Sequence, residues 1–508
     1  MDDLPSRHRV FAALAALLFA RLALHVAVVP PFEGPDEPFH LSRVSAVAHG
    51  GGILGVAPLD PAVQRAIPRH PCGPDLARAF GCPPFPGVRP KMPAVPPAPP
   101  PPAPAIVHAA YPNYENNQPP LYYAVAGGLL ALSEAIVPPP SGEAPEDELR
   151  RLRVLSLLFV AAAIAGPLRR LARRRSSLFV FFGMSALFLP GFSESFVRCS
   201  NDAMVFLWAA VIVDLVDRAY RGPALPLLLA AGCLIKLNAL PILVFVLVLL
   251  WRERRRGLAL LSAAAAAIPV VVLGGSTWGG AVKIAKRIPR PMPAGEVVAG
   301  LARSAYTIVK GVPWVGEWSF FRPPVWLLVL GLLLGAALAL GVRICAGSPR
   351  FPAHAAGLVV AIAGTFAFVL ADRRVFGAWG GVGGWYVWSW APWLALLADD
   401  TMEWRGNARW RVAAVPAYVL LFNVCWFAAA GRLYGWRKIP PGAPGVPGAV
   451  ANFSAFSAHS CRFSARWLFP TGPGWAGTRS SRGSARAGWA RSIGPGTASS
   501  AAKSPSRS

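Results

Sequence analysis

The sequence is short of charge. Only 15% of its 508 residues are charged, against 54% hydrophobic residues, and the mean hydropathy is +0.45. About one quarter of the residues of a soluble globular domain are charged. The composition therefore excludes an ordinary soluble domain and indicates a polytopic membrane protein.

Acidic residues are scarce, and none follows Glu403. Residues 431–508 are mostly Gly, Pro, Ser, Ala and Arg, which cannot bury a core, so we expect a disordered basic tail. The tail also resembles GC-rich coding sequence read out of frame, a hypothesis that resequencing would test. Much of the remaining excess of the +26 net charge lies in short loop clusters, and we expect no nucleic-acid partner.

Three motifs are missing as well. The seven cysteines contain no CxxC pair, although Cys72 and Cys82 share one loop and can form a disulfide if that loop is extracytoplasmic. There is no glycine-rich nucleotide-binding motif. There is also no obvious internal repeat, which would be typical of many transporters.

What the sequence does contain is apolar runs of membrane-spanning length. The run 10–29 has no cleavage site behind it and is interpreted as a retained first span. Two further runs, 119–137 and 224–251, are ambiguous. The clear runs are 10–29, 151–168, 177–192, 203–220, 258–275, 324–342, 354–371, 386–400 and 411–430.

Arginine clusters resolve both ambiguities, because short basic loops stay in the cytoplasm. The cluster RRLARRR (169–175) is cytoplasmic if 119–137 lies in the membrane interface instead of crossing. The cluster RERRR (252–256) is cytoplasmic if 224–251 is two short helices that break near Lys236. The sequence thus predicts an all-α polytopic membrane protein with about 11 transmembrane helices and a large first outer loop, 30–150, that carries interfacial helices.

This topology gathers several polar segments on the outer side of the membrane. They include the turn 193–202, the Lys236 break and a second large outer loop, 276–323. Loop 276–323 is basic and suited to a lipid phosphate. We therefore predict a transmembrane domain over 1–430 and a tail over 431–508, in a plasma or inner membrane, with the site on the extracytoplasmic side.

The motif PDEPFH, residues 35–40, follows the first span directly. Asp36 and Glu37 are candidate catalytic carboxylates, and His40 shares a helix face with Asp36. The alternative is that Pro35-Asp36 simply opens and caps an interfacial helix. Capping alone does not require two adjacent acids and a histidine.

Four other segments offer candidates for substrate binding, each with a structural alternative. Asn117 and Gln118 suit sugar hydroxyls while Tyr122 and Tyr123 anchor at the interface, or the segment is only a polar loop before an interfacial helix. Arg198 and Asp202 are ionisable groups at the outer junction of two spans, where such groups tend to be functional, or they merely form an i,i+4 ion pair. Lys236 meets a phosphate, or snorkels to the surface. Tyr386 reaches the site, or belongs to an aromatic belt.

Taken in order, PDEPFH (35–40), QPPLYY (118–123), RCSNDA (198–203) and LIKLNALP (234–241) resemble the GT-C superfamily of polytopic glycosyltransferases. That class contains protein O-mannosyltransferases and lipid A aminoarabinose transferases. The sequence looks most similar to a bacterial branch of predicted membrane proteins that share the P-D-E-x-x-H start. The resemblance covers roughly residues 10–430.

The resemblance implies inverting sugar transfer from a polyprenyl-phosphate donor to a glycan, lipid or protein acceptor at the outer membrane face. It maps the catalytic acid of the first loop onto Asp36, with Glu37 beside it, and the acid of the second outer loop onto Asp202. Trp385 stands where relatives often carry arginine, which leaves the donor phosphate to Lys236, Arg198 and the basic loop. No cofactor is assigned, a divalent metal is left open, and a transporter or lipid flippase is the alternative function.

Overall fold

The computed structural model describes residues 4–34, 36–54, 58–71, 80–83, 113, 115, 118–138, 145–175, 179–180, 183–184, 187–188, 190–287, 293–311, 349–376 and 385–401. These residues all belong to one unit, Met1–His459. The predicted spans 324–342 and 411–430 and the predicted tail 431–508 lie outside the described residues.

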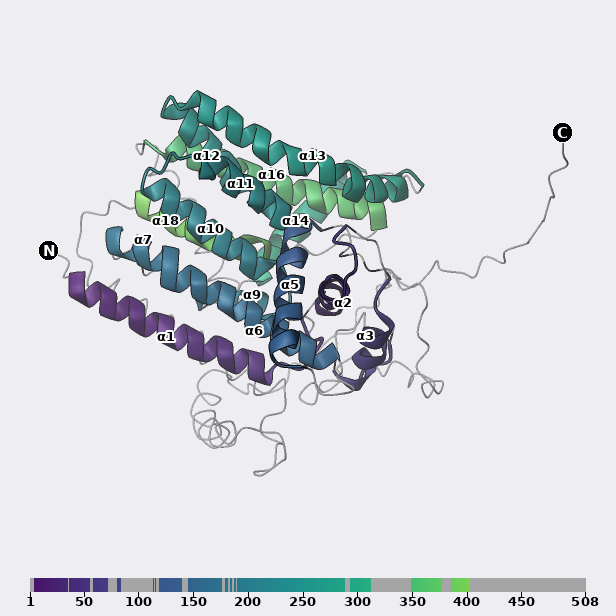
Figure 1. Ribbon diagram of the computed structural model, residues 1–508. Coiled ribbons are helices and arrows are strands. Elements are labelled where there is room, and N and C mark those ends of the chain that lie inside the picture. Colours follow the sequence, from purple (N-terminus) through teal and green to yellow (C-terminus); the bar gives the residue numbers. More distant parts are fainter. Residues whose placement is uncertain are drawn as a thin grey trace, which may run out of the picture. The chain divides into compact units, whose positions relative to one another are not determined.

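Every regular element of the described residues is a helix, and these residues contain no β-strand, which confirms the all-α prediction (Figure 1). The elements are α1 Leu4–Val28, α2 Glu37–Ala48, α3 Pro61–Ala66, η1 Ile67–Arg69, α5 Leu121–Ile136, α6 Pro145–Ala163, η3 Ile164–Leu168, α7 Arg169–Arg174, α9 Pro190–Val197, α10 Asp202–Asp217, α11 Ala224–Ile235, η4 Leu237–Ala239, α12 Leu240–Arg252, α13 Arg256–Arg287, α14 Ala294–Gly311, α16 Phe351–Phe376, α17 Trp385–Trp388 and α18 Ala391–Thr401.

Three helical segments in the described residues are long and apolar enough to cross a membrane: His8–Val28, Pro145–Arg174 and Phe351–Leu370. Four further apolar helices are shorter, among them α5, α11 and α12. At 1.5 Å per residue a 12-residue helix such as α11 rises only about 18 Å, less than the hydrocarbon thickness. The count of eleven spans therefore stays a prediction.

Ion pairs show how the helices run. Arg174 of α7 pairs with Asp217 at the end of α10, and Arg221, just beyond α10, pairs with Glu253 after α12. Lys236, between α11 and α12, instead pairs with Asp202 at the start of α10. Consecutive helices therefore turn back on one another between two ends, here called the arginine end (Arg170–Arg175, Asp214–Asp217, Arg221) and the loop end (Asp202, Lys236 and α2).

The predicted break in 224–251 is confirmed. Helix α11 ends at Ile235, and Lys236 adopts an extended conformation with φ −163° and ψ 140°. A single 3₁₀ turn follows, and α12 begins with Pro241 in its first turn, where the missing amide proton costs nothing. Because the break lies at the loop end, both arginine clusters, 169–175 and 252–256, lie at the arginine end.

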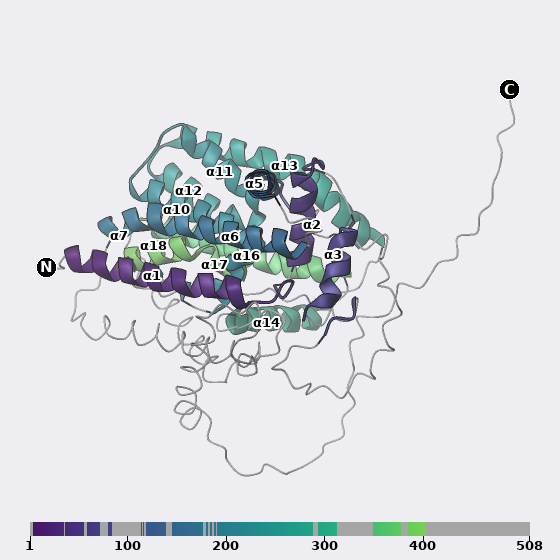
Figure 2. The ribbon, with the colours of Figure 1, turned by 60° about the horizontal axis from the view of Figure 1, so that its bottom comes forward.

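Two helices of the first loop lie across the long helices. In Figure 1, α5 stands upright over the ends of α6 and α10, and in Figure 2 α5 is seen end-on while α2 stands upright. This crosswise course agrees with a segment that does not span. Gly127 of α5 permits close packing on α2, because a Cβ there would lie 2.7 Å from the Val47 side chain.

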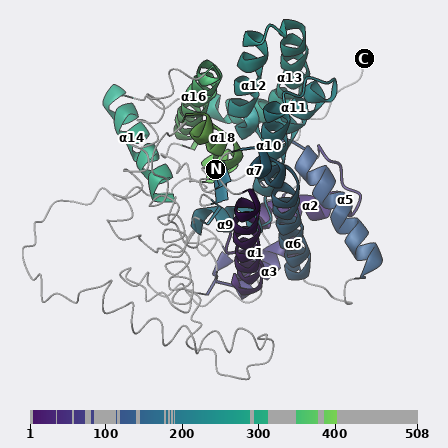
Figure 3. The ribbon, with the colours of Figure 1, turned by 90° about the vertical axis from the view of Figure 1, so that its left-hand side faces the viewer.

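The segment 276–323 differs from a simple loop. Residues 276–287 continue α13 to Arg287, because AVKIAKR favours a helix and the prolines at 289, 291 and 293 end it only later. Helix α14 then packs against α16 (Figure 3).

In the first loop, Cys82 is disulfide-bonded, which agrees with an oxidising compartment. Its predicted partner Cys72 lies outside the described residues.

Candidate functional site

Asp36 lies immediately before α2 in the left-handed region, with φ 64° and ψ −8°. Its side chain makes no capping hydrogen bond to the helix; only its carbonyl does so, accepting from the amides of Phe39 and His40 at 2.9 Å each. Asp60, in contrast, caps α3 with Oδ1 at 2.6 Å from the Ala62 amide. The capping alternative therefore accounts for the Asp60 side chain and not for that of Asp36.

The left-handed conformation at Asp36 costs about 1 kcal/mol for a residue with a Cβ, and such outliers concentrate at functional sites. The side chain is also half-buried, whereas every neighbour from Glu37 to Val44 is buried. Asp36 thus presents a carboxylate at the edge of a buried region.

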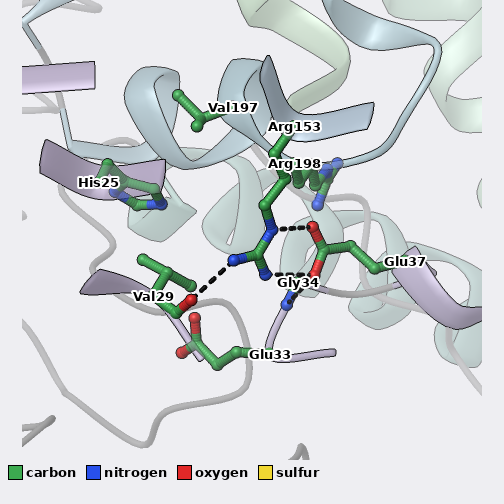
Figure 4. A pocket seen from close by; sticks show the side chains of 8 residues that line it. All are labelled: His25, Val29, Glu33, Gly34, Glu37, Arg153, Val197 and Arg198. Atoms are coloured by element: carbon green, nitrogen blue, oxygen red, sulfur yellow. Dashed lines mark hydrogen bonds and ion pairs between the residues drawn. The ribbon is translucent and has the colours of Figure 1, made fainter. Parts of the chain in front are cut away.

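Glu37 is fully buried and bound on all sides. Arg153 of α6 donates to both of its oxygens, at 2.9 and 2.7 Å, and the amides of Gly34 and Cys199 donate at 3.3 and 3.1 Å (Figure 4). Arg153 also donates to the carbonyl of Val29, at 2.6 Å. These contacts join the ends of α1 and α9 to the start of α2, so Glu37 positions Asp36. Its predicted catalytic role stays a prediction.

A narrow cavity lies beside this ion pair, and Figure 4 shows the Arg153 guanidinium between Glu37 and the Val29 carbonyl. The cavity is lined by His25, Val29, Glu33, Gly34, Glu37, Arg153, Val197 and Arg198. Most of these residues are polar and buried, so the cavity is a polar space behind the start of α2.

Asp202 holds two cations. Lys236 Nζ lies 2.6 Å from Oδ1, and Arg198 Nη2 lies 3.0 Å from Oδ2. All three side chains are nearly buried. The i,i+4 pair proposed as an alternative for Arg198 is therefore present, and the anion that meets Lys236 in this structure is Asp202. Two cations therefore share the Asp202 carboxylate.

The first loop and this charge cluster meet. Asn201 donates through Nδ2 to Gln118 Oε1 at 3.4 Å. Burial lowers the pKa of His40 well below its usual value, and the positive charges of Lys236 and Arg198 lower that pKa further. Residues up to about 200 positions apart in the sequence thus act on one another. The structure brings together seven predicted site residues: Asp36, Glu37, His40, Gln118, Arg198, Asp202 and Lys236.

Two predicted site residues are not placed. Asn117 and the side chain of Tyr386 lie outside the described residues. The turn after Tyr386 does reach the Lys236 break: Trp390 Nε1 donates to the carbonyl of Asn238 at 2.6 Å, and Asn238 Nδ2 lies 2.9 Å from the Ser389 hydroxyl.

Glu115 is the main residue that the sequence did not reveal. Its carboxylate is buried, and Oε2 accepts from the Tyr123 hydroxyl at 3.2 Å. That hydroxyl lies 2.8 Å from His40 Nδ1. Burial, together with the negative charge of Asp36, raises the pKa of Glu115 to about 8. Glu115 and Asp36 therefore lie close enough to influence each other's charge.

Arg43 secures this network from the other side. Its guanidinium lies 3.9 Å from the centre of the Tyr123 ring and donates to the carbonyl of Gln118 at 3.0 Å. The prediction that Tyr122 and Tyr123 anchor at a membrane interface is wrong for both side chains, because they are 1% and 0% exposed. They pack against α2 and the turn before α10 because α5 lies directly on α2.

Little in the sequence pointed to the missing residues. Arg153 ends the charged first half of α6, PEDELRRLR, where an arginine needs no buried partner. Nothing in the sequence around Glu115 distinguished it from the polar residues beside it.

No protein family, characterised protein or solved structure matches this chain in comparisons with known proteins.

Proposed function

We propose that the protein is a membrane glycosyltransferase. It transfers a sugar from a polyprenyl-phosphate donor to an acceptor hydroxyl at the extracytoplasmic face, and the site lies at the loop end. The observation that carries the proposal is the setting of Asp36. The Asp36 side chain does not cap α2, and its backbone lies in the left-handed region. Its negative charge acts on Glu115, which Lys236 of the buried Arg198–Asp202–Lys236 cluster also influences.

Asp36 acts as the general base. It takes the proton from the acceptor hydroxyl while that oxygen forms a bond to the anomeric carbon. The bond from the anomeric carbon to the donor phosphate oxygen breaks, and polyprenyl phosphate leaves with the bonding electrons. Attack from the opposite face inverts the anomeric configuration.

Arg198 and Lys236 serve the leaving group. Both side chains are cations held by Asp202, and they stabilise the negative charge developing on the phosphate. Asp202 fixes both cations in place, which spares the cost of ordering them when the donor binds. Gln118 and the predicted Asn117 and Tyr386 complete the polar lining for the sugar.

The helices of the first loop support this assignment. Helices α2 and α5, which begin just after Asp36 and Gln118, lie across the ends of the long helices, a course that suits approach of a lipid-linked donor from the membrane. The three segments of spanning length supply the membrane anchor.

The distribution of ion pairs does not favour the transporter alternative. In the described residues these pairs gather at the two ends of the long helices, while Arg21 lies buried within α1 and donates to the Phe188 carbonyl. A transport pathway is expected to place ionisable groups at intermediate depth.

A deletion strain of the source cell tests the proposal. We expect mass spectrometry of wall, lipid and protein fractions to show one lost glycan, restored by the wild-type gene and not by Asp36→Asn. An uptake defect with an unchanged glycan profile would instead support a transporter and contradict the proposal.

A further inference from the structure

We propose that His49, Glu134 and Glu148 form a binding site for a divalent transition metal, with Zn²⁺ as the best-fitting ion. The three side chains come from the end of α2, the last turn of α5 and the first turn of α6. Each offers one ligand atom, and these atoms all lie within 4.8 Å of one another. The site is separate from Asp36, which lies at the opposite end of α2.

The distances suit a zinc ion with modest adjustment. Tetrahedral ligands bound about 2.1 Å from zinc lie about 3.4 Å from each other. His49 Nε2 and Glu134 Oε2 are already 3.5 Å apart. The His49 side chain is 56% exposed. Its ring is held on the Ser45 carbonyl, so rotation of the two glutamate side chains would bring the remaining ligand atoms to zinc-binding distance.

The histidine ring is oriented as in a metal ligand. His49 Nδ1 lies 2.8 Å from the carbonyl oxygen of Ser45, and a carbonyl only accepts, so Nδ1 carries the proton. Nε2 of the neutral ring then has its lone pair directed toward Glu134. A backbone carbonyl that fixes the tautomer in this way is a regular feature around metal-binding histidines.

The charges around the site are unbalanced, which is the second observation in favour of a cation. Neither Glu134 nor Glu148 forms an ion pair with an arginine or a lysine among the described residues. Elsewhere in these residues, Glu37 is paired with Arg153 and Asp202 with Lys236. A single histidine, charged only when protonated, faces two carboxylates here.

The donor set selects the kind of metal. One imidazole nitrogen and two carboxylate oxygens suit zinc or manganese, whereas Ca²⁺ and Mg²⁺ prefer oxygen alone. Three protein ligands leave a fourth position for water on the exposed side of His49. A bound ion would fasten α2 to both α5 and α6, the three helices that also carry Asp36, Tyr123 and Arg153.

The test is a direct binding measurement on the full-length protein in detergent, after removal of metal with a chelator. We expect isothermal titration with Zn²⁺ to show one saturable site, and added Zn²⁺ to raise the unfolding temperature. Each of His49→Ala, Glu134→Gln and Glu148→Gln should weaken binding at least about tenfold. Because binding is measured without sugar transfer, its failure would leave the proposed function untouched.

His70→Ala is the matched control. His70 also faces a glutamate, Glu146, at 2.9 Å, but Arg69 pairs with the same carboxylate. This variant should bind Zn²⁺ like the wild type. Absence of saturable Zn²⁺ binding by the wild-type protein overturns the proposal. Equal binding by all three ligand variants, each eluting as a single species on gel filtration, overturns it as well.

Discussion

The arginine end and the loop end are both built from arginine and carboxylate side chains, yet they differ in burial. At the arginine end Asp214 is 1% exposed, while its partners Arg170 and Arg218 are 45% and 42% exposed. At the loop end both members of the Glu37–Arg153 pair are buried, at 0% and 4%. The first arrangement lets long arginine side chains keep their charge in water, and the second removes both charges from it.

The difference separates two uses of an ion pair. Partly exposed pairs contribute little individually, and Asp214 also has Arg174 as a further partner. Buried pairs are costly to desolvate and are weak devices for stability alone. A buried pair is retained at the loop end beside Asp36, whose backbone is left-handed and whose side chain does not cap α2. This fits a requirement for fixed geometry at a reacting centre.

The largest effect is expected from breaking the buried pair. Arg153→Met leaves the Glu37 carboxylate buried without its cation, which should lower the free energy of unfolding by about 3–5 kcal/mol. Arg170→Ala at the arginine end should cost less than about 1 kcal/mol, because Arg174 and Arg218 remain on Asp214. Thermal unfolding in detergent compares the two. Equal losses would show that burial does not distinguish the two ends.

The next effect concerns pH. The folded-state pKa of Glu115, about 8, exceeds its unfolded value of 4.5, so the folded protein holds the proton more tightly. Its contribution to stability is complete below pH 4.5 and is lost as the pH rises to about 8, by up to about 1.4 kcal/mol per unit. Glu115→Gln should remove this slope. If the unfolding temperatures of the variant and the wild type change in the same way between pH 5 and pH 8, this prediction is wrong.

A smaller effect contrasts the two N-cap aspartates. Asp60→Ala removes the hydrogen bonds to the Ala62 and Val63 amides and should cost about 1 kcal/mol. Sugar transfer per folded molecule should be unchanged, because the Asp60 side chain caps α3. A variant that keeps its unfolding temperature but loses transfer would place Asp60 in the site and undo the contrast.

Several features of the fold were predictable because they depend on local sequence. Pro241 and the lone Lys236 marked the break between α11 and α12, and the arginine clusters fixed which loops share an end. The crosswise course of α5 followed from the same charge argument. The number of spans stays a prediction, because helices as short as α11 and α12 do not by themselves establish a crossing.

The site was predictable only in part. The seven placed residues converge as the topology argument required. The partners that give them their roles were not predictable, because Arg153 lies 116 positions from Glu37 and Glu115 lies 75 positions after His40. Such pairings are decided by packing between helices. The backbone conformation of Asp36, which frees its side chain from capping, is likewise invisible in the sequence.

The central claim is that Asp36 removes the proton from the acceptor and does not serve the fold. Asparagine tolerates the left-handed conformation and has the same shape, so Asp36→Asn isolates the charge. We expect the purified variant to unfold at the wild-type temperature, and to release polyprenyl phosphate from the lipid-linked donor about 10²–10⁴-fold more slowly. A wild-type rate of release by the folded Asp36→Asn protein would contradict the assignment.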